Sequence, residues 1–318
     1  MQAYILRRLL ALIPTLIFAS IIVFVTVRLI PGDVIDMMLS QNDVSAGKMD
    51  REALVAALGL DKPMWLQYLS WVGQIFHGNL GNSLWQSTPV VERIAERLPI
   101  TAELGALALL IGVIIALPIG VYSAIRQDTV GDIATRSFSI LLLAIPSFWL
   151  GTMVVVIPSI WWGWSPPVSY IPFHEDPVGN LKQMLLPAAV LGAALSAITM
   201  RMTRTMMLEV LRQDYIRTGW AKGLTERLIV MRHALRNALI PVVTLIGLQA
   251  PLIIGGTVIL EQIFGIPGMG NLLLDAVNTR DYPIITGVFL VVGVAVMLIN
   301  LIVDLSYGFL DPRVRVRS

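Results

Sequence analysis

The stretch TAELGALALLIGVIIALPIGVYSAI, residues Thr101–Ile125, decides the fold class of this chain. Glu103 is its only charged side chain, and roughly 20 apolar residues in a helix are enough to cross the hydrocarbon core of a bilayer. Five further stretches are uncharged and similarly apolar: Leu9–Val27, Ser137–Trp162, Gln183–Met200, Ala238–Leu260 and Tyr282–Val303. The sequence therefore predicts an all-α membrane protein with six transmembrane helices.

The composition agrees with this prediction and excludes several other classes. The 318 residues are 56% hydrophobic and 14% charged, whereas a soluble domain is about 45–50% apolar and about 25% charged. No dense basic stripe indicates nucleic-acid binding. The absence of cysteine excludes disulfides and thiolate metal sites. The first apolar segment is too long for the core of a signal peptide, so it is expected to be a retained span.

The basic residues predict the orientation of the chain. If the N-terminus is cytoplasmic, the inner segments carry 15 of the 23 lysines and arginines. Such an excess on the cytoplasmic side is typical of membrane proteins. With six spans, both termini are then expected in the cytoplasm.

This topology divides the chain into an N-terminal tip with the first helix (1–30), an outer segment (31–96), a core with five transmembrane helices (97–310) and a cytoplasmic tail (311–318). In the outer segment, apolar helical spacing is predicted at 50–63 and at 65–76. The tryptophans of the second stretch suit the membrane interface, although a small cap packed on the ends of the spans would have the same pattern. The turn-rich GNLGNS, Gly78–Ser83, ends this segment.

The inner segment 201–237 is highly charged yet has helical apolar spacing, interrupted at Gly219 and Gly223. Two short helices joined by a glycine turn are predicted. A connector that only fixes the topology would need neither the apolar face nor this length. The pattern therefore favours a short helix that inserts into a groove on a partner protein.

The sequence lacks the parts of a catalytic site. Its three histidines are widely separated, and it has neither a HExxH motif nor a phosphate-binding loop with lysine. The glycine run GIPGMGN, Gly265–Asn271, is expected to form a tight turn or a half-inserted loop rather than a nucleotide site. No enzymatic activity, cofactor or metal is predicted.

A few polar residues lie at or near membrane depth, where they are costly. Glu103, Glu261 and Asp304 lie near the ends of spans and could extend to the interface, while Gln249 and Asn300 could bond between helices. They do not form a chain of carboxylates that resembles a proton relay. Clusters of small residues, such as Gly192–Ala197, would let helices approach closely.

Several strings in the chain resemble the permeases of ABC importers. DYIRTGWAKGL (Asp214–Leu224), followed by RHALRNALIP, is similar to their cytoplasmic "EAA" loop, most of all in the dipeptide, oligopeptide and nickel family. Further similar strings follow in the family's order along essentially the whole chain: GLDKP, GNLGNS, RLPITAEL, IPSFWLG, LPA, FGIPGMG, TRDYP and LDPRVR.

The resemblance implies the pore-forming permease subunit of a type I ABC importer in the cytoplasmic (inner) membrane of a prokaryote. It would translocate di- or oligopeptides, or a related solute such as nickel, and would not be an enzyme itself. The implied partners are a second, paralogous permease, two cytoplasmic ATP-binding subunits, an outer substrate-binding protein and membrane lipid. The alternative is a secondary transporter or channel that works without ATPases.

The resemblance also implies a site that couples the chain to its ATPases, within residues 208–238. Tyr215, Trp220 and Leu224 would contact the groove of an ATPase, and Gly223 would form the turn. The full implied set is Asp214, Tyr215, Arg217, Thr218, Trp220, Ala221, Lys222, Gly223 and Leu224.

The chain departs from the family pattern at two places in this site. Gly219 and Trp220 stand where alanine and arginine are usual, and Arg217–Gly219 replaces the literal Glu-Ala-Ala. As charges, Arg217 and Lys222 could either contact an ATPase or simply be solvated.

The translocation pathway is predicted from position alone. The candidates lie in the third and fifth spans: Pro146, Ser147, Phe148, Gln249 and Pro251.

Overall fold

The computed structural model describes residues 2–29, 35, 51, 55, 59, 61–167 and 169–310, without the side chains of 2–9, 304 and 306–310. The regular structure of these residues is helical apart from one isolated bridge between Asn82 and Pro89. The all-α prediction is therefore confirmed. The predicted stretch 50–63 lies mostly outside the described residues, and the tail 311–318 lies wholly outside them.

The chain divides into two compact units. The first comprises Met1–Arg8, Ile100–Gly270 and Val296–Ser318, and the second comprises Leu9–Pro99 and Asn271–Ala295. Helices α1 (Gln2–Arg28), α5 (Val90–Ile125), α13 (Met269–Thr279) and α14 (Tyr282–Leu310) each contribute to both units.

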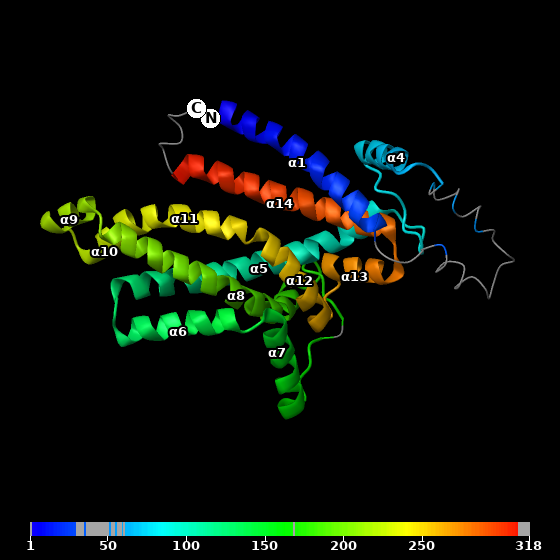
Figure 1. Ribbon diagram of the computed structural model, residues 1–318. Coiled ribbons are helices and arrows are strands. Elements are labelled where there is room, and N and C mark those ends of the chain that lie inside the picture. The colour runs from blue at the N-terminus through cyan, green and yellow to red at the C-terminus, as the bar shows by residue number, and fades with distance from the viewer. Residues whose placement is uncertain are drawn as a thin grey trace. The chain divides into compact units, whose positions relative to one another are not determined.

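Helix α8 (Pro177–Leu211) is central to the first unit. It contacts α6 (Val130–Ala144), α7 (Ser147–Trp162), α11 (Leu235–Leu248) and α12 (Ala250–Phe264). Figure 1 shows α6 and α11 beside it. Glycines let α8 approach α5 closely. A Cβ on Gly192 would lie 2.7 Å from the carbonyl oxygen of Ala108, and a Cβ on Gly112 would lie 3.1 Å from the carbonyl oxygen of Gly192. The predicted close approach at the small residues is confirmed here.

Breaks in the helices modify the predicted spans. The third predicted span, Ser137–Trp162, is bent by 91° between α6 and α7, where Pro146 lacks the N–H that would continue the helix. The fifth, Ala238–Leu260, is divided at Gln249, and α12 in turn is bent by 82° from α13. Within the described residues, five helices are long and apolar enough to cross a membrane, or up to seven if each bent pair is one span.

Glu261 differs from its prediction, because its side chain is buried rather than extended to the interface. The Thr101 hydroxyl donates to its carboxylate at 2.6 Å and accepts from the backbone N–H of Met269 at 2.8 Å. A Cβ on Gly268 would lie 2.3 Å from the same carboxylate. The glycine run thus forms the predicted turn, folded closely around an acidic side chain.

In the second unit, two distant motifs meet at Asp281. Its carboxylate accepts a hydrogen bond from the Ser83 hydroxyl at 2.5 Å and from the backbone N–H of Leu84 at 3.2 Å. The Trp85 indole donates to the carbonyl of Thr279 at 2.8 Å. The GNLGNS turn is therefore fastened to the TRDYP string just before α14.

Helix α4 (Met64–Phe76) confirms the predicted helix at 65–76. One face packs on α1, where the rings of Tyr68 and Trp71 lie 5.3 and 5.6 Å from that of Phe24. The other face exposes Trp65 and Phe76. The helix therefore combines the two predicted alternatives, a packed cap and an exposed aromatic surface.

Candidate functional site

The candidate site is built on α9 (Asp214–Ala221), a short helix between α8 and α11. A turn connects α9 to α10 (Glu226–Leu228), which continues into the π-helical segment η1 (Ile229–Ala234) and α11. The short helix α9 and the glycine turn after it match the pattern predicted for residues 201–237. The second predicted helix is not short, because it continues through η1 into α11 without a break.

Gly223 ends α9 in a left-handed conformation with φ = +78°. Its N–H donates to the carbonyl of Trp220 at 2.9 Å, and the N–H of Leu224 donates to that of Gly219 at 3.2 Å. This pair of bonds is the Schellman motif, in which glycine follows the C-cap and an apolar residue follows the glycine. The sequence after Gly219 therefore terminates the helix at a defined angle.

The inner face of α9 is anchored by one side chain. Ile216 is 1% exposed and belongs to an apolar cluster with residues of α5, α8, η1 and α11. Leu224 packs against the same cluster. In addition, the Tyr215 hydroxyl accepts a hydrogen bond from Asn237 at 2.8 Å. Because α9 is only eight residues long, these contacts rather than its own helix propensity hold it in place.

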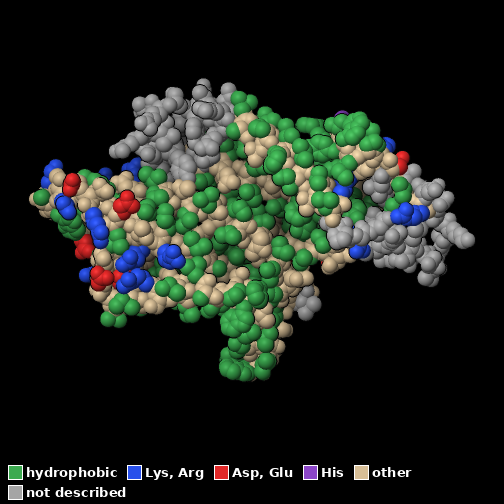
Figure 2. Space-filling view, viewed as in Figure 1, with side chains coloured by type: hydrophobic (Ala, Val, Ile, Leu, Met, Phe, Trp, Pro, Cys, Tyr) green, Lys and Arg blue, Asp and Glu red, His purple; other side chains and the backbone are tan. Residues whose placement is uncertain are grey.

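The remaining predicted residues form an outward face. The side chains of Arg217 and Asp214 are 75% and 96% exposed and pair at 3.4 Å, an interaction that contributes little in solvent. Trp220 is 47% exposed. Thr218, Ala221 and Lys222 are exposed as well. Figure 2 shows basic and acidic side chains gathered over the α9 and α10 end of the first unit.

The structure thus divides the predicted coupling residues into two groups. Leu224, expected to contact a groove on an ATPase, lies half-buried and turned into the chain's own apolar cluster. Gly223 shapes the turn. The residues that remain available to a partner are Asp214, Tyr215, Arg217, Thr218, Trp220, Ala221 and Lys222.

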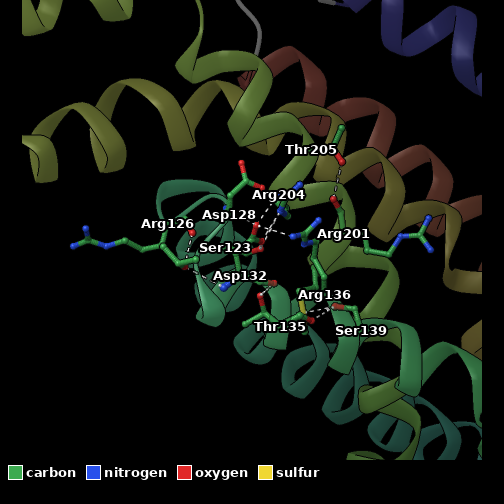
Figure 3. A network of polar contacts seen from close by, with 12 residues as sticks. Ser123, Arg126, Asp128, Asp132, Thr135, Arg136, Ser139, Arg201, Arg204 and Thr205 are labelled. Atoms are coloured by element: carbon green, nitrogen blue, oxygen red, sulfur yellow. Dashed lines mark hydrogen bonds and ion pairs between the residues drawn. The ribbon is translucent and has the colours of Figure 1, made fainter.

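A buried ion pair lies close to this element and was not predicted from the sequence. Asp132, whose side chain is fully buried, accepts two hydrogen bonds of 2.9 Å from Arg204 (Figure 3). The Ser123 hydroxyl also donates to Asp132, and the Asp128 N–H does so at 3.0 Å. The network joins the end of α5 and the first turn of α6 to α8.

The network and α9 share helix α8. Met207, less than one turn after Arg204, is fully buried in the apolar cluster that holds Ile216. A displacement of α9 would therefore act on the part of α8 that the ion pair ties to α5 and α6. The local sequence marks only the start of α6. Thr129 caps the first turn of this helix by accepting a hydrogen bond from the N–H of Asp132.

The predicted pathway residues lie at the two helix breaks. Pro146, Ser147 and Phe148 begin α7 at its bend from α6, and Phe148 is 51% exposed. At the other break Gln249 is 2% exposed and donates to the Thr199 hydroxyl at 3.1 Å, which confirms its predicted bond between helices. Pro251 follows in the first turn of α12, where its missing N–H costs nothing.

Among the described side chains, no group of three or more histidines and carboxylates could hold a metal ion. The long apolar helices pack through glycine and are broken at proline. They carry a short anchored helix with an exposed polar and aromatic face. These features define a multi-pass helical membrane protein with a projecting helical element.

The chain belongs to the family of binding-protein-dependent transport system inner membrane components. The family profile matches residues 116–316, and the profile of the N-terminal domain of such components matches residues 1–105. The chain is a permease component in the inner membrane, crossing it several times, as the sequence predicted.

Individual relatives match over their whole length. The dipeptide transport system permease protein DppB of Escherichia coli (strain K12) is 39% identical over 339 aligned positions, covering 99% of each chain. A Brucella abortus (strain 2308) protein with a provisional name as a peptide transport system permease is 40% identical over 315 positions, again with 99% of each covered.

The fold also matches a solved structure. An inward-facing conformation of the MetNI methionine ABC transporter has a chain that is 17% identical, with a TM-score of 0.54, covering 69% of this chain and 96% of that one. At this identity the likeness concerns the fold alone.

Proposed function

We propose that this chain is the pore-forming permease subunit of an ATP-driven importer that carries di- or oligopeptides across the cytoplasmic membrane. The full-length likeness to peptide permeases carries the proposal. The substrate class is taken from these relatives.

The outward face of α9 is the proposed docking site for a cytoplasmic ATP-binding subunit. Trp220 and Tyr215 would enter a groove of the ATPase, and Arg217 and Lys222 would contact its rim. A partly exposed tryptophan on a rigidly anchored helix has the properties of an interface hot spot. ATP would be hydrolysed by two such subunits, and movement would pass through Ile216 and Met207 to the Asp132–Arg204 network.

The complex would also contain a second, paralogous permease and an outer substrate-binding protein. Six crossings with both termini in the cytoplasm remain the proposed topology. In this arrangement α11 and α12 share one crossing that is broken at Gln249, and α13 stays on the outer side. The α9 face and the Asp132–Arg204 network then lie on the cytoplasmic side.

The topology can be tested with single cysteines, since the chain has none of its own. Cysteines replacing the exposed Lys182 and Arg227 are expected to react with an impermeant maleimide from opposite sides of the membrane. Labelling of both from the same side in intact cells would contradict the six-crossing topology.

Transport is tested in proteoliposomes that contain the purified permeases, with and without the ATP-binding subunits, and a labelled dipeptide loaded onto the binding protein. Uptake is expected only with the ATPases and ATP. Uptake by this chain alone would instead favour the alternative, a secondary transporter or channel that works without ATPases.

A further inference from the structure

A cavity of about 220 Å³ lies in the second unit, between the end of α1, helix α4 and the start of α14. Arg28 lines it from α1, Trp71 from α4 and Tyr282 from α14. It is separate from the α9 element and from the pathway candidates. The further lining residues are Gly59, Lys62, Gln67, Ser70, Gln74, Leu80, Gly81, Leu84, Pro283 and Thr286.

Among the described residues, the charges that line this cavity are all positive. Arg28 and Lys62 are basic, and no acidic residue occurs among the described residues that line it. Both the Nε and an Nη of Arg28 donate to the side-chain oxygen of Gln67, at 3.1 and 3.0 Å, while its guanidinium stacks 3.6 Å from the ring centre of Phe24. These contacts orient the guanidinium, and no carboxylate among the described residues pairs with it.

A further donor lies in the wall of the cavity. The indole N–H of Trp71 is buried without an acceptor in the described part of the chain, although its ring is held against Phe24 and Tyr68. A buried donor without a partner is costly. An anionic ligand with several acceptor oxygens would compensate both this donor and the guanidinium.

The cavity lies where two apolar helices end. Arg28 is the last residue of the candidate span Leu10–Arg28, and Tyr282 is the first residue of the candidate span Tyr282–Val303. The cavity is therefore at the level of the lipid headgroups rather than in the hydrocarbon core. In the proposed topology this is the outer leaflet.

Apolar side chains next to the cavity continue toward the bilayer. Along α1, Ile17, Phe18 and Ile22 are 53%, 67% and 49% exposed. Helix α4 exposes Trp65 and Phe76 at 62% and 86%, and Figure 2 shows this apolar surface over α4. A ligand with a charged head and acyl chains would match both surfaces, and such interfacial helices bind membranes through apolar contact together with attraction to anionic lipids.

We propose that this cavity binds the headgroup of an anionic phospholipid. Arg28 holds the phosphodiester with its remaining donors, Trp71 contributes the indole N–H, and Lys62 selects for net negative charge. The acyl chains then lie along the exposed face of α1. A bound lipid would connect α1, α4 and α14 and so stabilise the second unit.

The test measures phosphatidylglycerol bound to the delipidated, full-length permease in detergent, by native mass spectrometry. One phosphatidylglycerol per chain is expected to bind more tightly than phosphatidylcholine. Arg28→Gln is expected to weaken this binding about tenfold, the loss of one charge-assisted hydrogen-bonding partner. Lys62→Gln, an exposed residue whose loss does not threaten folding, should abolish the preference for phosphatidylglycerol.

The matched control is Lys182→Gln, which removes an exposed cation that does not line the cavity. It should bind phosphatidylglycerol like the wild type. Equal binding by Lys62→Gln, Lys182→Gln and the wild type would overturn the proposal. Competition by inorganic phosphate or by alanyl-alanine at the concentration of the lipid would also overturn it, because the cavity would then be a site for free anions or for peptide.

Discussion

The turn after α9 offers a sharp test of the docking proposal. Gly223 has φ = +78°, and a Cβ at this position would meet no atom within 4 Å. A substitution there changes the backbone preference without creating a steric clash. Alanine in the left-handed conformation costs about 1–2 kcal/mol. Proline cannot adopt this φ and also removes the N–H that donates to Trp220.

These costs predict a graded loss of ATPase binding. If the whole cost falls on the docked conformation of α9, Gly223→Ala should weaken ATPase binding about 5- to 30-fold. Gly223→Pro should cost about 3 kcal/mol or more, which corresponds to a loss of more than about 100-fold. Insertion of the spans should be unaffected, because the turn lies outside the predicted spans.

The assay is co-purification of the ATP-binding subunits with the tagged permease, quantified per permease. Gly163→Pro is the matched control, because Gly163 also ends a helix at φ = +65° with no atom within 4 Å of a Cβ, but at the end of α7. Full recovery of the ATPases with Gly223→Pro would refute the docking role of α9. Equal loss with both proline variants would refute its specificity.

Three further changes have definite expected outcomes. Trp220→Ala should weaken ATPase binding about 30-fold, a loss of about 2 kcal/mol, with an unchanged melting temperature in detergent; an unaltered affinity would exclude Trp220 from the interface. Asp132→Asn leaves Arg204, 19% exposed, without its carboxylate and should lower the free energy of unfolding by about 3 kcal/mol. Asp128→Asn, at an exposed neighbouring site, should melt like the wild type, and equal melting of the two variants would argue against the ion pair. Gly192→Ala places a Cβ 2.7 Å from a carbonyl oxygen of α5 and should destabilise the α5–α8 contact by about 1–3 kcal/mol. The melting temperature in detergent should therefore fall. A melting temperature at or above that of the wild type would show that α5 and α8 move apart without cost to accommodate the Cβ.

Much of the site could be predicted because its signals are local. The glycine at residue 223 follows a short charged helix, and this order of residue types produces the Schellman turn that the structure contains. The inward position of Leu224 could not be predicted. Its apolar character suits both a partner's groove and the chain's own core, and only the packing of α5, α8 and η1 distinguishes the two.

The buried ion pair shows the same limit over a longer distance. Asp132 and Arg204 are 72 residues apart in sequence, and each alone resembles a solvated charge near the end of a span. Their pairing depends on the contact between α6 and α8, which hydropathy does not specify. Membership of the family, by contrast, follows from motifs that can be read without any contact.

The sequence by itself determined that this chain is an all-helical membrane protein, because length and apolar content specify helices that suit a bilayer. Its motifs, in their order along the chain, indicated the permease family. The tertiary structure decided how those helices break and what they enclose. Hydropathy marks neither the 91° bend at Pro146 nor the division at Gln249, since it is the same on both sides of a break. The buried carboxylate of Glu261 and the cationic cavity at Arg28 likewise arise only when distant segments pack together, because burial and charge balance depend on neighbours in space.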